Sequence, residues 1–268
     1  MINLVSDKNG TLYAQNIYEK YNTLVLSGGA LKIIYTLGFL SIINKSILPC
    51  INNYVGTSAG GITCFLLSIG YSPIEIFKKL LTYDIIANVF KIFNIYFDMV
   101  KKMCISKLGK DDITFEDHYK LTGKVLVIIS YNMTKTQSEE LSVFTKPHLS
   151  IYKALHMTSS LPIINNPIIE ENEKYIDGMI CDNFPIRFGI TYSEGNLLCV
   201  TTLRSEYNIS EWYGIEGITI IMINDTYDFI PYIVCTKKDK LNMFYKGVTT
   251  AITIPIPSIN IRKRRNSI

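Results

Sequence analysis

The feature that most constrains this chain is a serine set between a short apolar run and an apolar helix, in the stretch YVGTSAGGITCF at residues 54–65. Residues 56–60 read Gly-Thr-Ser-Ala-Gly, the G-x-S-x-G spacing of a serine exposed on a sharp strand-to-helix turn. A buried strand before Ser58 and a helix after it, ending at Gly70, form one unit of an α/β fold.

A second unit of the same kind comes before this turn. The run TLVLS at 23–27 ends at Gly28 and Gly29, and residues 31–46 then carry apolar side chains at helical spacing. Further strands and helices are predicted in the chain order 50–56 (strand), 72–83 and 84–110 (helices), 124–132 and 139–145 (strands), 150–160 (helix), 196–203 and 217–224 (strands) and 239–252 (helix). This alternation predicts one layered α/β domain with a mostly parallel central sheet.

The chain also divides by position. We expect a lead-in at 1–22, a core at 23–203, and a C-terminal extension at 204–268 that packs on the same domain and ends in a basic tail. The basic runs at 237–240 and 262–265 are typical of a solvated loop and a frayed tail, and the alternative is contact with an anionic membrane surface.

Composition excludes several classes of function. A net charge of +4 is mild, and no aromatic residues interleave the basic tail, so nucleic-acid binding is not indicated. The 6 cysteines form no C-x-x-C pair and the 3 histidines lack zinc-ligand spacing, which predicts reduced thiols, no metal and no cofactor. Residues 1–10 lack a signal-peptide pattern, so we expect a cytoplasmic protein, with peripheral membrane contact left open.

The base that would activate Ser58 is not evident from its own motif. A serine hydroxyl is a weak nucleophile and needs a base, usually histidine, while a capping serine in a glycine-rich turn explains the motif equally well. His118 lies in a helix-start pattern, His148 in a loop and His156 within a helix, so we expect each to be structural or on the surface. Asp177 follows a short strand-like run and comes directly before Gly178, which allows close approach to another backbone. The alternative is an ordinary Asp-Gly turn.

A third element is LSGGALK at 26–32. A glycine turn from strand to helix points backbone N–H groups at one place, where they can hold a phosphate or an oxyanion; a tight turn alone is the alternative. The segment is neither G-x-G-x-x-G nor a P-loop, so nucleotide binding is not supported. Asp182 and Asn183 are interpreted as turn formers.

Together, in this order, the three elements resemble the patatin-like phospholipases, a family of serine–aspartate lipid acyl hydrolases. The family's G-G-G-x-K/R-G, G-x-S-x-G and D-G-G/A motifs correspond to GGALKI at 28–33, GTSAG at 56–60 and DGM at 177–179. The blocks ALHMTSSLPIINNPI and YIDGMICDNFPI are also similar to family blocks, and the resemblance covers about residues 23–203. It implies a three-layer patatin-like fold.

The resemblance also implies a mechanism. Asp177 would take the proton of Ser58 directly, and an acyl-enzyme would follow, with no cofactor. The implied oxyanion donors are the N–H groups of Gly28, Gly29 and Ala30, with Lys32 as an anion or headgroup contact. The implied substrates are phospholipids or other lipid esters, cleaved by phospholipase A-type or lysophospholipase activity; some members of the family need an activating protein. The alternatives are a catalytically silent membrane- or partner-binding module and an acyltransferase.

Three positions depart from the family pattern. Ala30 and Ile33 replace glycines, and a positive φ at either would strain the side chain. Met179 replaces a small residue after Asp-Gly. Since alanine keeps its N–H, we expect the oxyanion hole to persist. The helix at 84–110 is expected to cover the core, and a lid or membrane-facing helix, with Lys101 and Lys102 near headgroups, is the alternative.

Overall fold

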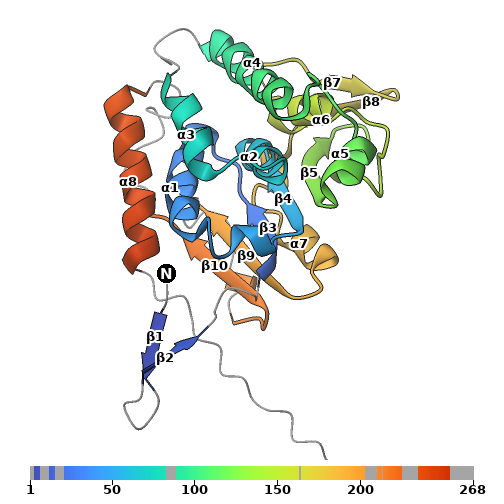
Figure 1. Ribbon diagram of the computed structural model, residues 1–268. Coiled ribbons are helices and arrows are strands. Elements are labelled where there is room, and N and C mark those ends of the chain that lie inside the picture. The colour runs from blue at the N-terminus through green and yellow to red at the C-terminus, as the bar shows by residue number, and fades with distance from the viewer. Residues whose placement is uncertain are drawn as a thin grey trace, which may run out of the picture.

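The computed structural model describes residues 3–6, 12–15, 21–82, 89–162, 164–202, 210–212, 214–224 and 235–253. Its centre is an eight-stranded sheet with helices on both faces (Figure 1). The strands are β3 (Tyr21–Leu26), β4 (Asn53–Thr57), β5 (Val125–Asn132), β6 (Gln137–Ser142), β7 (Ile168–Glu170), β8 (Glu173–Asp177), β9 (Asn196–Thr201) and β10 (Ile218–Met222). A separate antiparallel pair, β1 (Asn3–Ser6) and β2 (Leu12–Gln15), precedes them.

The sheet is mixed. Its strand order is β10-β9-β3-β4-β5-β8-β7, with β6 also paired to β5. Every neighbouring pair from β10 to β5 is parallel, while β6, β8 and β7 pair antiparallel. The parallel half matches the predicted buried strands, because strands buried on both faces read as continuous apolar runs. The predicted, mostly parallel α/β fold is therefore confirmed.

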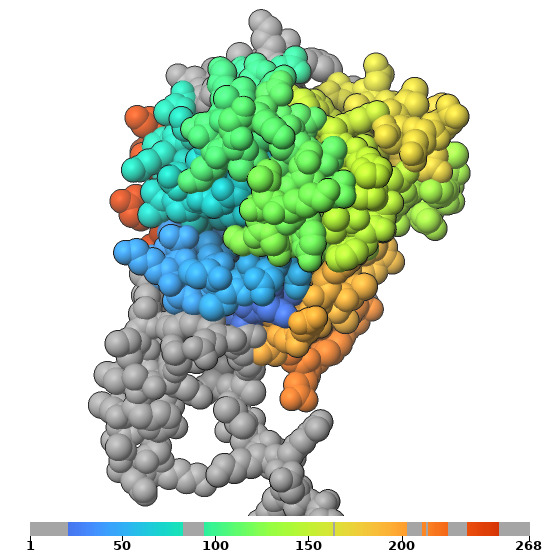
Figure 2. Space-filling model, turned by 45° about the vertical axis from the view of Figure 1, so that its right-hand side comes forward, coloured from blue at the N-terminus to red at the C-terminus, as the bar shows by residue number. Residues whose placement is uncertain are grey.

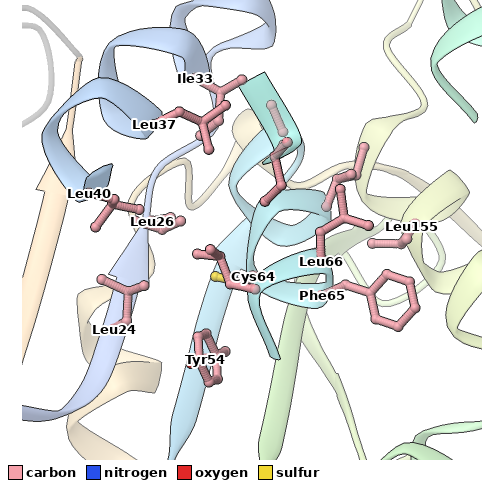
Figure 3. Packing of buried hydrophobic residues seen from close by; sticks show 14 of the residues in the cluster. Leu24, Leu26, Ile33, Leu37, Leu40, Tyr54, Cys64, Phe65, Leu66 and Leu155 are labelled. Carbon is pink, nitrogen blue, oxygen red and sulfur yellow. The ribbon is translucent and has the colours of Figure 1, made fainter. Parts of the chain in front are cut away.

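The main helices are α1 (Ile33–Ile43), α2 (Ala59–Ser68), α3 (Pro73–Thr82), α4 (Val89–Leu108), α5 (Phe115–Thr122), α6 (Ile151–Ser159), α7 (Ile186–Tyr192) and α8 (Lys237–Thr253). Side chains alternate across the strands, so Leu24 and Leu26 join the core beneath α1 and α2, while Val25 joins a second core beneath α7. Figure 3 shows the first core, where Leu24, Leu26 and Leu40 meet between β3 and α1. Two cores on opposite faces give the expected three layers.

The helix α4 covers the core. Its apolar residues Phe97, Met99, Val100 and Met103 are buried. In Figure 2 the residues of α4 and α5 (green) form one continuous area of the surface. The expectation of a core-covering helix is thus confirmed for the described part, 89–108. The ammonium group of Lys101 forms an ion pair with Asp111 at 2.9 Å. Among the helices that the structure describes, none combines the length and the apolar character needed to cross a membrane.

After residue 203, β10 joins the central sheet beside β9 and α8 packs on α1. α8 lies along α1 (Figure 1), and the two backbones meet at paired glycines. A Cβ on Gly38 would lie 2.1 Å from the carbonyl oxygen of Phe244, and one on Gly247 would lie 1.9 Å from that of Tyr35. No side chain larger than hydrogen fits at either position, so the two glycines set the distance between the helices.

One local prediction in this extension is wrong. Residues 237–240, interpreted as a solvated loop, form the first turn of α8. Lys240 is buried and its ammonium group donates to the carbonyl oxygen of Leu80, 2.9 Å away, near the end of α3. A cation at a helix C-terminus satisfies an otherwise unpaired carbonyl. The basic tail at 262–265 lies outside the described residues.

Candidate active site

Ser58 sits on the turn between β4 and α2, as its motif predicts. Its backbone has φ 52° and ψ −125°, a combination that costs an L residue on the order of 1–3 kcal/mol. The glycines of the motif allow this turn to pack. A Cβ on Gly60 would lie 2.5 Å from the carbonyl oxygen of Leu26, and one on Gly56 would lie 2.6 Å from the backbone nitrogen of Gly61. The packing of β3, β4 and α2 therefore holds Ser58 in a strained, partly exposed position.

Asp177 lies at the end of β8 and faces this serine. The antiparallel pairing of β8 with β5 places Asp177 opposite Ser130. Gly178 then passes so close to β5 that a Cβ on it would lie 2.4 Å from the carbonyl oxygen of Ile129. In this arrangement Ser58 Oγ donates a hydrogen bond to Asp177 Oδ2 at 2.8 Å.

The aspartate is held by a second hydrogen bond on its other oxygen. The backbone N–H of Met179 donates to Asp177 Oδ1 at 2.9 Å. The two bonds fix both carboxylate oxygens, so Oδ2 points at the serine hydroxyl. Met179 thus contributes to the site through its backbone N–H, and this contribution does not depend on its side chain.

Burial changes the acidity of this carboxyl group. Only 1% of Asp177 is exposed, and desolvation raises its pKa to about 7, against the opposing effect of the hydrogen bonds from Met179 and Ser58. A carboxylate in water is too weak a base to take a proton from serine at neutral pH, and a pKa near the working pH is the better match for proton transfer. Asp177 is therefore both oriented and more basic than an ordinary aspartate.

The segment at 28–33 forms the glycine turn that the sequence predicts. Gly29 has φ 150° and Ala30 has φ 48°, whereas Ile33 has an ordinary helical φ of −53°. Of the two replaced glycines, only Ala30 is strained, and Ile33 fits without cost. Lys32 ends the short 3₁₀ turn (Ala30–Lys32) that leads into α1. Its role as an anion contact stays a prediction.

The N–H groups of this turn differ in availability. The N–H of Gly28 donates to the carbonyl oxygen of Asn183 at 3.0 Å. Within the described ranges, the N–H groups of Gly29 and Ala30 have no acceptor. The roles predicted for these three groups in an oxyanion hole stay predictions. Within the described residues, the N–H groups of Gly29 and Ala30 are the two available to bind an oxyanion.

Comparison with known proteins identifies the family. The model of the patatin-like phospholipase family matches residues 24–190, more than half of the chain. The chain belongs to the patatin-like phospholipases. A protein of Invertebrate iridescent virus 6 named "Probable lipid hydrolase" is 38% identical to this patatin-like chain, over 98% of the chain and 97% of the viral protein. An uncharacterized protein of Acanthamoeba polyphaga mimivirus is 28% identical over 73% of each.

Solved structures agree with the fold of this patatin-like hydrolase. VipD from Legionella pneumophila superimposes with a TM-score of 0.57 at 15% identity, over 94% of this chain and 69% of VipD. The type III effector ExoU of Pseudomonas aeruginosa gives a TM-score of 0.55 at 15% identity, over 87% of this chain and 52% of ExoU. The chain thus spans about half the length of ExoU. At such low identity, both comparisons support the fold alone.

Two residues of the patatin-like site were missed in the sequence. Thr158 of α6 accepts a hydrogen bond from the Ser58 backbone N–H at 2.8 Å and donates to the carbonyl oxygen of Ile129. Asn183, interpreted as a turn former, contacts the glycine turn through its backbone carbonyl. Both lie in the blocks at 154–168 and 175–186 that resemble the family. This resemblance was the one sequence feature that could have pointed to them.

The three histidines pack against other residues or lie on the surface, as expected, and none has a described hydrogen bond to Ser58. His118 is buried and its Nε2 contacts Ser68 Oγ at 2.7 Å; burial lowers its pKa to about 4. His156 stacks on Phe97 at 3.6 Å between ring centroids, and His148 is exposed beside Glu116. Within the ranges described, no three His, Cys, Asp or Glu side chains are placed to hold a metal ion.

Proposed function

We propose that this patatin-like hydrolase cleaves carboxylic esters of lipids, with Ser58 as nucleophile and Asp177 as its base. The observation that carries this proposal is the 2.8 Å hydrogen bond from Ser58 Oγ to the buried Asp177 carboxylate. The family match and the viral relative named as a lipid hydrolase support lipid esters as the substrate class. The specific activity proposed is that of a phospholipase A or a lysophospholipase.

The geometry supports a two-step reaction. As Ser58 Oγ attacks the ester carbon, its proton moves to Asp177 Oδ2, and the carbonyl oxygen becomes an oxyanion. The N–H groups of Gly29 and Ala30, which have no acceptor among the described residues, are the donors of the turn that we assign to that charge. Collapse of the tetrahedral intermediate breaks the ester bond, and Asp177 returns the proton to the departing alcohol oxygen. Ser58 then carries the acyl group.

The second step releases the fatty acid. A water molecule attacks the acyl carbon while Asp177 takes its proton, and the intermediate collapses to a free carboxylic acid. Asp177 passes the proton back to Ser58 Oγ, which restores the starting state. Each proton is thus moved by one carboxyl group, and its pKa of about 7 lets the group both accept and donate near neutral pH.

The silent-module alternative loses its main support. The two replaced glycines, Ala30 and Ile33, are the features that would favour a silent module. The backbone at Ala30 takes a positive φ in spite of its side chain, and Ile33 needs no positive φ. No feature of the described residues favours acyl transfer over hydrolysis. We propose a cytoplasmic location with peripheral contact at the membrane that supplies the lipid.

The test is release of free fatty acid from vesicles of phosphatidylcholine mixed with lysophosphatidylcholine. We expect release by the wild type and a loss of at least about 10³-fold in Ser58→Ala and Asp177→Asn, since each removes a group that the reaction requires. Ser46→Ala and Asp111→Asn are matched controls away from the site and should stay within about twofold. Full activity in Asp177→Asn would refute the assignment of the base.

A further inference from the structure

The side chain of Asn183 is buried, and its polar atoms form no hydrogen bond with the described residues. Its residue is 2% exposed, and its Oδ1 is buried with no hydrogen-bond partner among the described residues. Nor is an acceptor present there for its amide nitrogen. A buried polar group without a partner costs about 1–3 kcal/mol, so such a group is expected to have a role that offsets the cost.

The side chain lies against the glycine turn, near Ser58. The point that a Cβ on Gly28 would occupy is 2.2 Å from Asn183 Oδ1 and 3.2 Å from Ser58 Cβ. Only glycine at position 28 leaves room for the carboxamide there. The unpaired group therefore lies beside the serine at which the ester would react.

The same residue removes a donor from the turn. The backbone carbonyl of Asn183 accepts the N–H of Gly28, so this N–H is engaged before any substrate binds. Of the three N–H groups predicted to form the oxyanion hole, Gly29 and Ala30 keep theirs unpaired in the described structure. A further donor at this place would have to come from a side chain.

We propose that the Asn183 carboxamide is this donor and contacts the oxyanion through Nδ2–H; the proposal rests on the proposed ester hydrolysis at Ser58. A carboxamide presents either its oxygen or its nitrogen at a given place after rotation about its last torsion. Rotation breaks no hydrogen bond here, because neither atom has a partner in the described residues. The developing negative charge then favours the N–H over the oxygen.

The energetic consequence is specific to the transition state. In the resting enzyme the amide oxygen is buried without a partner among the described residues, and in the tetrahedral intermediate the amide N–H gains a charge-assisted hydrogen bond. Interactions formed in the transition state alone raise kcat rather than lower KM. Removal of one oxyanion donor typically lowers kcat by about 10²–10³-fold.

The test compares wild type, Asn183→Leu and Asn183→Asp, with Thr63→Val as the matched control. Leucine has nearly the size of asparagine without polar atoms, and aspartate keeps the shape without an N–H. Thr63 Oγ1 is likewise buried and unpaired in the described fold, but it lies within α2. The readouts are the rate of Ser58 labelling by a fluorophosphonate, kcat and KM on p-nitrophenyl butyrate, and Tm.

We expect Asn183→Leu to keep or raise Tm while kcat and the labelling rate fall about 10²-fold and KM changes less than about threefold. Thr63→Val should keep its rates. Labelling of Asn183→Leu at the wild-type rate would overturn the proposal. A fall in the rates of Asn183→Leu that is matched by a fall in its Tm would also overturn it, because a loss of folded protein would then explain the rates. A wild type that is itself unlabelled would refute ester hydrolysis at Ser58 first.

Discussion

The burial of Asp177 lowers the free energy of unfolding at a pH where this carboxyl group is ionised, and the size of the loss follows from its pKa. The pKa of this carboxyl group rises from an ordinary 3.8 to about 7 in the fold. Because the folded pKa is the higher one, protonated Asp177 contributes stability to the fold. This contribution is fully present below pH 3.8 and is lost as the pH rises through 7. The gap is about three pH units at about 1.4 kcal/mol each, so the wild type loses about 4 kcal/mol across it.

Asparagine at this position does not titrate, so the variant Asp177→Asn isolates the effect. The free energy of unfolding of Asp177→Asn minus that of the wild type should rise with pH by about 1.4 kcal/mol per unit between pH 5 and 7 and be constant above about pH 8. Urea denaturation followed by circular dichroism, at half-unit steps from pH 5 to 9, measures it. Other titrating groups cancel in the difference.

Ser58→Ala provides the internal check. The hydrogen bond from Ser58 lowers the pKa of Asp177, in opposition to burial. Its removal should therefore shift to higher pH the range over which stability, taken relative to Asp177→Asn, is lost. If the unfolding energies of wild type and Asp177→Asn stay parallel within about 1 kcal/mol over the whole range, Asp177 has an ordinary pKa and the account of its basicity is wrong.

Three further predictions follow from the same structure. The kcat/KM for ester hydrolysis should rise with pH to a plateau with an apparent pKa of about 7, because only ionised Asp177 accepts the serine proton; a flat profile from pH 5 to 9 would contradict this. Ala30→Gly should raise the free energy of unfolding by up to about 1 kcal/mol, because glycine accepts φ 48° without strain, and a fall in urea midpoint would refute it. His118, whose folded pKa of about 4 lies below its ordinary 6.5, should lower stability by about 3 kcal/mol as the pH falls from 6.5 to 4; His118→Gln should flatten that decline, and an unchanged slope would count against it.

The sequence predicted most of the elements because burial leaves a periodic pattern. The runs at 23–27, 124–132 and 196–203 became β3, β5 and β9 with small shifts at their ends. β7, with three residues and an exposed Ile169, carries too little pattern to be predicted. The first turn of α8 was misread because a run of lysines is usually solvated, and only the packing against α3 shows that Lys240 is buried.

The site was predictable to a different degree at each residue. Ser58 has a local motif, but Asp177 lies 119 residues later, and only the resemblance to the family brought the two together. Their contact depends on the antiparallel pairing of β8 with β5, which no local pattern specifies. Asn183 contacts the glycine turn through its backbone carbonyl and carries a buried amide oxygen, and neither property is visible in the identity of an asparagine before Phe-Pro.

The glycine contact between α1 and α8 couples two positions that are distant in the sequence. A side chain at Gly38 or at Gly247 would force the same two helices apart, so once one position has gained a methyl group, a second methyl at the other meets a gap that is already open. The stability losses of Gly38→Ala and Gly247→Ala should therefore sum to more than the loss in the double variant. Gly247 meets Tyr35 in the first turn of α1, and α1 begins at the glycine turn beside Ser58. A side chain at position 247, outside the matched family region, would therefore push on the end of α1 that is nearest to the serine.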